Sequence, residues 1–490
     1  MMKQRSKFKH LKELLGTGVL FLFTLISVAQ SKSEMIGELM EKYSEYEQFN
    51  GSVLVSENGD VIFKKGYGMA NMEFDIPNEP DTKHRLGSIT KQFTAMLILQ
   101  LVEEGKLELD KPISNYLPDY EGPAAEEVTI HHLLTHSSGI PSYTSFPGFF
   151  ENQSRDPYTP GEFVKTFADS TLQFMPGEKF AYNNSGYFLL GHIIEEVSGK
   201  SYEKMLEENI FEPVGMNNSG YDHHGNIIKN RAAGYERAGN GYRNAPYLDM
   251  SIPYAAGSLY STVEDLYLWD QALYEEELLS EELKEEMFEA HIKDGDSKYG
   301  YGWGLGKMPI GKTADSIQTI AHGGGINGFN TLLIRVPEEK HLIVLLNNTG
   351  GTNLGEMASS ILNILYGADY DMPKRSAAME LLPVFRNQGV SAGMEKYKAL
   401  KEDETYALKE NEMNMIGYQL LQSGKTEEAI EVFKINVEEF PESGNVYDSL
   451  GEAYLEAGQK ELAIENYKKS VEIDPGNTNG INILKKLEQE

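Results

Sequence analysis

Residues 86–101 read LGSITKQFTAMLILQL, a glycine and a serine followed by a nearly uninterrupted apolar run. Ser88 stands three residues before Lys91, which puts both side chains on one face of a helix, a turn apart. A helix this apolar should be buried, and burial lowers the pKa of a lysine. The stretch therefore predicts a buried helix whose first turn pairs a serine nucleophile with a lysine base.

The Ser-x-x-Lys pattern is weak by itself. It recurs as Ser6/Lys9 near the N-terminus and as Ser201/Lys204 in a charged helix. In any single instance, a surface serine beside a lysine is the simpler interpretation. The apolar helix that follows Ser88 is what distinguishes this copy from the others.

Two further elements carry chemistry. In Tyr182-Asn183-Asn184 the tyrosine can shuttle a proton, and the second amide can hold a substrate carbonyl. The alternative is an ordinary turn, and a similar pattern recurs at Tyr242/Asn244. In His322-Gly323-Gly324-Gly325, glycines let a substrate approach and leave amides free for an oxyanion. The alternative here is a glycine-rich hairpin turn with a structural histidine.

The surrounding chain predicts a mixed α/β fold. Two β-rich stretches, 51–56 and 61–67, flank Asn58-Gly59, a strong hairpin signal. Near residue 340 the patterns predict three more strands, over 316–321, 331–336 and 341–346. Helices are expected between the two groups of strands, over 90–104 and 187–197. A sheet drawn from both ends of a domain, with helices inserted, indicates α/β with an antiparallel sheet.

The C-terminal region repeats itself every 34 residues. Small residues, aromatics and prolines recur at fixed offsets: Gly417, Gly424, Ala429, Phe433 and Pro441 return as Gly451, Gly458, Ala463, Tyr467 and Pro475. This period is typical of tetratricopeptide helix pairs. Two units are few, so a capping helix is expected over 481–488. The predicted domains are a signal peptide at 1–29, a main domain at 30–367, a helical linker at 368–408 and the repeats at 409–490.

Composition limits the function classes. The 490 residues include 44 Lys and Arg against 75 Asp and Glu, a net charge of −31, which argues against nucleic-acid partners. Without cysteine, disulfides, thiolate metal sites and cysteine nucleophiles are excluded. The pairs His131-His132 and His223-His224 lack the one-turn spacing and nearby carboxylate of a zinc hydrolase. No metal or cofactor is expected.

The first thirty residues have the pattern of a targeting segment. Basic residues between 3 and 12 precede the uncharged run 14–31, and Ser27 and Ala29 stand before a plausible cut ahead of Gln30. This predicts a cleaved signal peptide and an exported protein, periplasmic or secreted, without stable membrane insertion. An uncleaved anchor is the open alternative, because the run approaches the length of a membrane span.

Taken together, and in this order within one domain, the elements resemble the serine β-lactamase and penicillin-binding superfamily, including class C β-lactamases, D-Ala-D-Ala carboxypeptidases and esterase relatives. The resemblance extends over most of residues 35–365. It includes longer runs: HLLTHSSGIP (132–141), PGEKFAYNNSGY (176–187), GHIIE (191–195) and IFEPVGM (210–216). It implies a β-lactamase/transpeptidase-like domain, an antiparallel sheet flanked by helices with an all-helical subdomain.

The resemblance also implies roles for the catalytic residues. Ser88 would be acylated, and Lys91 would deprotonate it. Tyr182 would protonate the leaving group and help to activate the deacylating water. The implied activity is serine acyl hydrolysis of an ester, a D-amino-acid peptide or a β-lactam.

A second group of residues would bind the substrate. Asn184 would hold the substrate amide, and the backbone amides of Ser88 and Gly325 would form the oxyanion hole beside Gly324. His322 takes the place of the family's third-motif Lys or His. Tyr143 stands where class C enzymes carry an amide side chain that faces the substrate.

Departures from the family pattern bear on the substrate. The third motif of β-lactamases usually reads Lys-Thr-Gly, whereas Gly323 has no side chain and His322 need not be charged at pH 7. Both changes should weaken capture of an anionic β-lactam, which favours an esterase or D-peptide hydrolase. Residues 301–304, Tyr-Gly-Trp-Gly, are expected either to line the cleft or to pack on the core.

Two functions from different classes remain. One is an active hydrolase, acting on a small-molecule or peptide substrate. The other is a catalytically silent scaffold whose tetratricopeptide groove binds a protein partner. The presence of all three catalytic elements favours the enzyme.

Overall fold

The computed structural model describes residues 32–238, 241–295 and 297–487. The chain divides into two compact units, Met1–Glu236 with Arg243–Met372, and Arg237–Tyr242 with Pro373–Glu490. The predicted domain bounds stay predictions. The signal peptide expected over 1–29 lies outside the described residues. Among the residues that the structure describes, no helix is long and apolar enough to cross a membrane.

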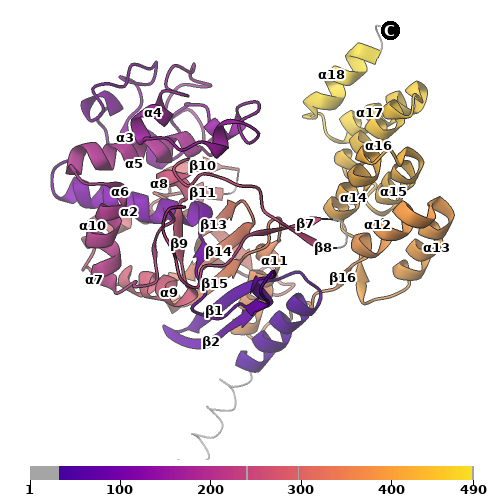
Figure 1. The fold of residues 1–490 in the computed structure, drawn as a ribbon, viewed down its shortest axis with the longest axis horizontal. Coiled ribbons are helices and arrows are strands. Elements are labelled where there is room, and N and C mark those ends of the chain that lie inside the picture. The colour runs from indigo at the N-terminus through magenta and orange to yellow at the C-terminus, as the bar shows by residue number, and fades with distance from the viewer. Residues whose placement is uncertain (1–31, 239–240, 296, 488–490) are drawn as a thin grey trace, which may run out of the picture. The chain divides into compact units, whose positions relative to one another are not determined.

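The first unit is built on an eight-stranded sheet in the order β10-β11-β12-β13-β14-β15-β1-β2, with all neighbours antiparallel (Figure 1). The predicted hairpin is confirmed, since Asn58 and Gly59 both take positive φ between β1 and β2. The strands are β1 (Gly51–Glu57), β2 (Asp60–Tyr67), β10 (Ile292–Asp294), β11 (Ser297–Tyr299), β12 (Gly304–Pro309), β13 (Ser316–Ile326), β14 (Phe329–Val336) and β15 (His341–Asn347).

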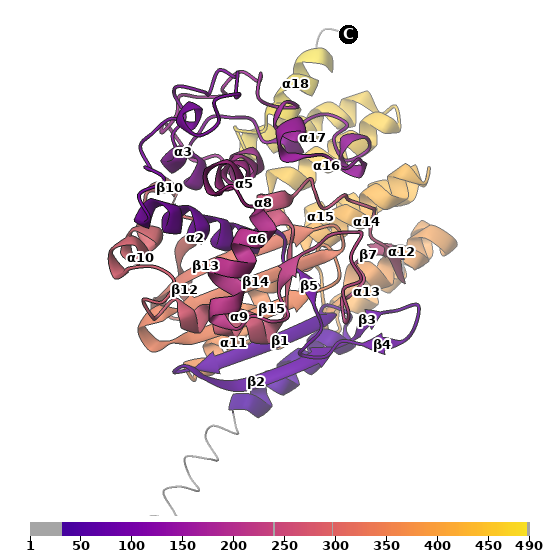
Figure 2. The same ribbon diagram turned by 60° about the vertical axis from the view of Figure 1, so that its left-hand side comes forward.

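Successive side chains of the central strands enter two different cores. On β1, Leu54 joins a large cluster on one face, whereas Val53 and Val55 join a second cluster on the other. A helix over residues 32–45 and α11 (Leu354–Leu365) cover the second face, below the sheet in Figure 2. Both faces of the sheet are therefore buried, which is why β15 is buried along its whole length and apolar from Leu342 to Leu346.

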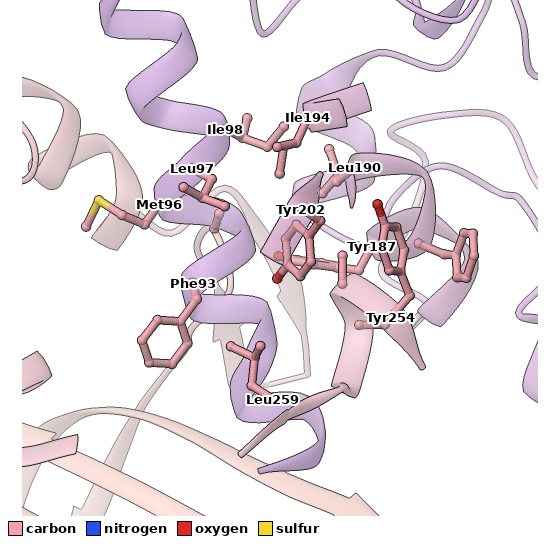
Figure 3. Packing of buried hydrophobic residues seen from close by; sticks show 14 of the residues in the cluster. Phe93, Met96, Leu97, Ile98, Tyr187, Leu190, Ile194, Tyr202, Tyr254 and Leu259 are labelled. Atoms are coloured by element: carbon pink, nitrogen blue, oxygen red, sulfur yellow. The ribbon is translucent and has the colours of Figure 1, made fainter. Parts of the chain in front are cut away.

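Helix α2 (Thr90–Glu103) forms the centre of the larger core. It follows the 3₁₀ turn η1 (Gly87–Ile89), and its side chains are buried on every side through Leu99. Figure 3 shows Ile98 of α2 beside Ile194 of α5 (Asn184–Ser198). The expected fold class, an antiparallel sheet flanked by helices, is confirmed.

Short helices surround this core. They are α3 (Ile130–Leu134), α4 (Pro160–Val164), α6 (Tyr202–Leu206), α7 (Glu212–Val214), α8 (Tyr254–Gly257), α9 (Val263–Ala272) and α10 (Glu281–Phe288). The second Ser-x-x-Lys copy begins α6, where the Ser201 hydroxyl caps the helix by accepting the Lys204 backbone amide. The Lys204 ammonium pairs with Glu207 at 2.8 Å. This copy has a structural role, as a helix cap on the surface.

The structure differs from the expectation at the glycine-rich motif. His322 to Gly325 lie inside β13, paired residue by residue with β14, and the turn comes later, at Asn327-Gly328. The pattern of strand residues ended at Ala321, because glycine has low strand propensity. Pairing with β14 keeps these glycines extended all the same.

The second unit consists of antiparallel helices around one core. Small residues allow close approach within each repeat: a Cβ on Gly417 would meet the Phe433 ring at 2.5 Å, and one on Gly451 would meet Tyr467 at 3.1 Å. The expected capping helix is present. The helices are α12 (Ala377–Gln388), α13 (Val390–Lys401), α14 (Glu410–Gln422), α15 (Thr426–Glu439), α16 (Gly444–Glu456), α17 (Lys460–Ile473) and α18 (Thr478–Leu487).

Candidate active site

Ser88 and Lys91 meet at the start of α2. The turn η1 presents Ser88, and Lys91 follows on the same helical face, so that its Nζ lies 3.1 Å from Oγ of Ser88. A neutral amine at this distance can accept the hydroxyl proton. The sequence prediction of a paired hydroxyl and amine agrees with this arrangement.

The surroundings of Lys91 favour its neutral form. The residue is fully buried, and burial lowers the pKa of its amine well below the usual value. Its Nζ donates to the Ala256 carbonyl at 2.8 Å and to Oδ1 of Asn184 at 2.9 Å. Neither partner is an anion, so neither compensates the loss of water with a negative charge.

Tyr182 lies beside both Lys91 and Ser88. The Lys91 amine lies 4.9 Å from the centre of its ring, and its hydroxyl hydrogen-bonds Ser88. Packing raises the pKa of Tyr182, while the Ser88 hydrogen bond opposes that rise. The residue keeps 42% of its surface exposed, so a leaving group can reach it. A neutral tyrosine in this place can relay a proton to or from the serine.

Asn184 is positioned by the first turn of α5. The preceding Asn183 caps that helix by accepting the Gly186 amide at 2.8 Å. Because Oδ1 of Asn184 accepts from Lys91, its amide nitrogen is oriented away, toward the Thr144 hydroxyl at 3.4 Å. This leaves an N–H donor at the cavity wall, the group needed to hold a substrate carbonyl.

The glycines explain how β13 reaches the nucleophile. A Cβ on Gly324 would lie 1.9 Å from the Leu86 carbonyl, which also accepts the Thr331 hydroxyl at 2.7 Å. A Cβ on Gly87, at φ +56°, would lie 2.9 Å from the Gly325 amide. Gly324 is therefore required by packing against η1, and Gly325 is the glycine that faces the cavity.

His322 is buried behind these residues. Its Nε2 lies 2.9 Å from the Tyr299 hydroxyl and its Nδ1 lies 2.6 Å from the Gly323 carbonyl. Burial, and secondarily the nearby Lys91, lowers the pKa of His322 to about 4. The imidazole is thus neutral at pH 7, as its sequence context suggested, and both of its nitrogens already have partners within the protein.

A cavity of about 380 Å³ opens beside Ser88. Four of the predicted residues line it, namely Ser88, Asn184, Gly325 and Tyr143. Tyr143 is almost fully buried, and its hydroxyl donates to the Ile252 carbonyl at 3.2 Å. Its ring packs against Phe149 and Phe163, so it forms part of an aromatic wall, and its hydroxyl is engaged by the Ile252 carbonyl.

The Tyr-Gly-Trp-Gly segment packs on the core, one of the two expected alternatives. Tyr301 and Trp303 are buried, and Gly302, at φ +78°, lets the chain pass against the Lys91 carbonyl. Two contributors to the site had no signal in the sequence. The Ala256 carbonyl acts through its backbone, and Glu236 lies on a segment without a recognisable pattern.

Comparisons with known proteins agree with this geometry. The Beta-lactamase family model matches residues 34–365, and a Tetratricopeptide repeat model matches residues 444–477. Penicillin-binding protein 4* of Bacillus subtilis (strain 168) is 31% identical over 376 residues, which cover 71% of this chain and 79% of that protein. A teichoic acid D-alanine hydrolase of Staphylococcus aureus is 28% identical over 317 residues, covering 64% and 74%.

A solved structure extends the likeness to three dimensions. The octameric penicillin-binding protein homologue from Pyrococcus abyssi superposes with a TM-score of 0.59 at 33% identity, over 72% of this chain and 81% of that one. With the family model matching more than half of its length and the Ser88, Lys91 and Tyr182 cluster intact, the chain belongs to the β-lactamase and penicillin-binding family of serine hydrolases, joined to C-terminal tetratricopeptide repeats.

Proposed function

We propose that the protein is an exported acyl hydrolase that forms an acyl-enzyme on Ser88 and acts on esters or amides whose acyl part is small and carries no carboxylate. The observation that carries this proposal is the buried amine of Lys91, 3.1 Å from the Ser88 hydroxyl and beside a cavity. Tyr182 would pass the proton to the leaving group, and Asn184 would hold the acyl part.

The cavity supports the restriction on the acyl part. Its wall is largely aromatic and aliphatic, with Tyr143, Phe149, Phe150, Leu248, Ile252 and Phe329. Among the described residues that line it, none is a lysine or an arginine, and the charged one is Glu236. No cationic side chain of this lining would compensate a substrate carboxylate, which disfavours penicillins and peptides with a free C-terminus.

A D-amino acid is the acyl group that we favour. Its small side chain suits the apolar wall, and its ammonium would approach Glu236, a residue about a quarter exposed and paired with Arg243 at 2.7 Å. The relative that hydrolyses teichoic acid D-alanine supports this choice. Ester and D-peptide substrates are both compatible with the cavity.

Intact-mass spectrometry tests the proposal. The protein would be exposed separately to a fluorescent penicillin, a phosphonate ester and D-alanine p-nitroanilide, with Ser88→Ala and Ser201→Ala alongside. We expect an adduct with the phosphonate, lost in Ser88→Ala and retained in Ser201→Ala, and slower labelling by penicillin. The absence of any adduct in a folded protein would instead favour the silent scaffold, with the repeats binding a protein partner as its function.

A further inference from the structure

His136 contacts three consecutive residues around the catalytic tyrosine. Its backbone carbonyl accepts the Ala181 amide at 2.9 Å, and its Nδ1 accepts the Asn183 amide at 3.0 Å. Between these two contacts, its ring lies against the Tyr182 ring, with centroids 4.3 Å apart and planes tilted by 38°. His136 is buried and holds φ at +57°, a costly conformation for a residue with a side chain.

The hydrogen bonds of His136 fix its tautomer. A backbone N–H can only donate, so Nδ1 of His136 must carry a lone pair and Nε2 must carry the proton. That Nε2 lies 3.3 Å from the Tyr299 hydroxyl and therefore donates to it. The assignment rests on the roles of the partner atoms, because hydrogens are not observed directly.

His322 takes the opposite tautomer. The Gly323 carbonyl can only accept, so Nδ1 of His322 must donate and Nε2 must accept. The Tyr299 hydroxyl, 2.9 Å away, donates to it. One directional chain results, from the Asn183 amide through His136, Tyr299 and His322 to the Gly323 carbonyl, with every donor matched to an acceptor.

We propose that Tyr299 and His136 are positioning residues for Tyr182, and that this hydrogen-bonded chain holds the tyrosine over Ser88 and Lys91. The His136 ring packs against the Tyr182 ring, and His136 accepts hydrogen bonds from the backbone amides of Ala181 and Asn183 on either side of it. Tyr299, from β11, fixes the orientation of both histidines. The inference rests on the proposed acyl-enzyme function of Ser88.

Burial is the main cause that keeps the two histidines neutral, and several ionisable groups face them. They are Lys91 from α2, Tyr187 from α5, Tyr182 in the loop before α5, and Tyr299 from β11. Burial lowers the pKa of His136 well below its usual value, with Lys91 and His322 as smaller causes. Protonating His322 would require breaking the bond donated by Tyr299. In this hydrogen-bonded chain the N–H of His322 is donated to the Gly323 carbonyl, so it is not available to a substrate carboxylate.

Tyr299→Phe tests the proposal, because it removes the hydroxyl and keeps the ring. Tyr301→Phe is the matched control: this tyrosine is also buried, and its hydroxyl bonds His131 at 2.8 Å, away from the site. With p-nitrophenyl butyrate, we expect kcat of Tyr299→Phe to fall by roughly 10- to 100-fold, since a misplaced catalytic group is costly. KM should change by about twofold or less, because ground-state binding is not involved.

The titration of His322 gives a second readout. Removing the hydroxyl donor leaves Nε2 of His322 free to accept a proton, so the pKa of His322 should rise. Nitrogen-15 spectra recorded against pH should show this rise in Tyr299→Phe and no change in Tyr301→Phe. Equal kcat and an equal pKa of His322 in the two folded variants would overturn the proposal.

A measurement without turnover separates this inference from the proposed function. Nitrogen-15 spectra of histidine-labelled protein distinguish the two tautomers, with His136→Asn and His322→Asn supplying the assignments. We expect an Nε2–H signal for His136 and an Nδ1–H signal for His322. The His322 signal should change in Tyr299→Phe and stay unchanged in the control Tyr301→Phe. The same tautomer at His136 and His322 would refute the hydrogen-bonded chain even in an active enzyme. The expected tautomers without an acyl adduct would refute only the proposed function.

Discussion

Alanine substitutions along the three glycines of β13 separate packing from catalysis. None of Gly323, Gly324 and Gly325 has a positive φ, so alanine is compatible with the backbone at each position. What differs is the space that the new methyl group enters. The three variants therefore test whether the contact of β13 with η1 has been interpreted correctly.

The structure gives a different magnitude for each variant. A Cβ at Gly324 would lie 1.9 Å from the Leu86 carbonyl and 2.3 Å from Oγ1 of Thr331, two atoms joined by a hydrogen bond. Overpacking and the loss of that bond together should lower the free energy of unfolding by about 2–6 kcal/mol. At Gly323 the nearest atom is 3.6 Å away, so alanine should stabilise by about 0.5–1 kcal/mol.

Gly325→Ala should change activity more than stability. Its nearest contact, Nδ2 of Asn330, is at 3.9 Å, and the methyl group would enter the cavity wall beside Ser88. Urea unfolding measures the stability of all three variants, and the rate of phosphonate labelling of Ser88 measures acylation. A Gly324→Ala variant as stable and as reactive as Gly323→Ala would refute the described approach of β13 to η1.

The remaining predictions concern the base, the surface copy of the motif and the repeats. The acid limb of kcat/KM against pH should lie well below 10.5, because Lys91 acts as a base only when neutral and burial lowers its pKa; a limb near 10.5 would contradict this role. Ser201→Ala should leave labelling unchanged and cost about 1 kcal/mol of stability through the lost helix cap, measured by urea unfolding; a large loss of activity would mean that the wrong motif was chosen. Gly417→Leu should lower the melting temperature followed by far-ultraviolet circular dichroism, because even a Cβ there would lie 2.5 Å from the Phe433 ring; an unchanged melting curve would show that the helix pair tolerates wider spacing.

Local patterns in the sequence predicted much of this fold. The apolar run after Ser88, the Asn58-Gly59 turn and the 34-residue period each have a cause within one element, and each corresponds to the observed helix, hairpin or repeat. The pairing of Ser88 with Lys91 follows from helical spacing alone. These features did not depend on distant parts of the chain.

Other features depended on contacts that a local pattern does not contain. Gly324 is explained by Leu86, some 240 residues earlier, and the hydrogen bond from His136 to Tyr299 forms only when β11 brings Tyr299 beside the ring. Glu236 and the Ala256 carbonyl reach the site through tertiary packing. The motif at 322–325 was recognised, but its strand conformation was not, because pairing with β14 overrides the low strand propensity of glycine.

The position of β1 has a consequence for the order of folding. This strand lies between β2, its neighbour in sequence, and β15, which begins at His341. A ribosome must therefore deliver almost the whole first unit before β1 acquires its second partner, and contacts of such long range are slow to form. The repeats, in which each helix packs mainly on its neighbours, have no such delay. A nascent chain that stops before β15 would leave the backbone N–H and C=O groups along one edge of β1 unpaired, a site for aggregation that only completed synthesis removes.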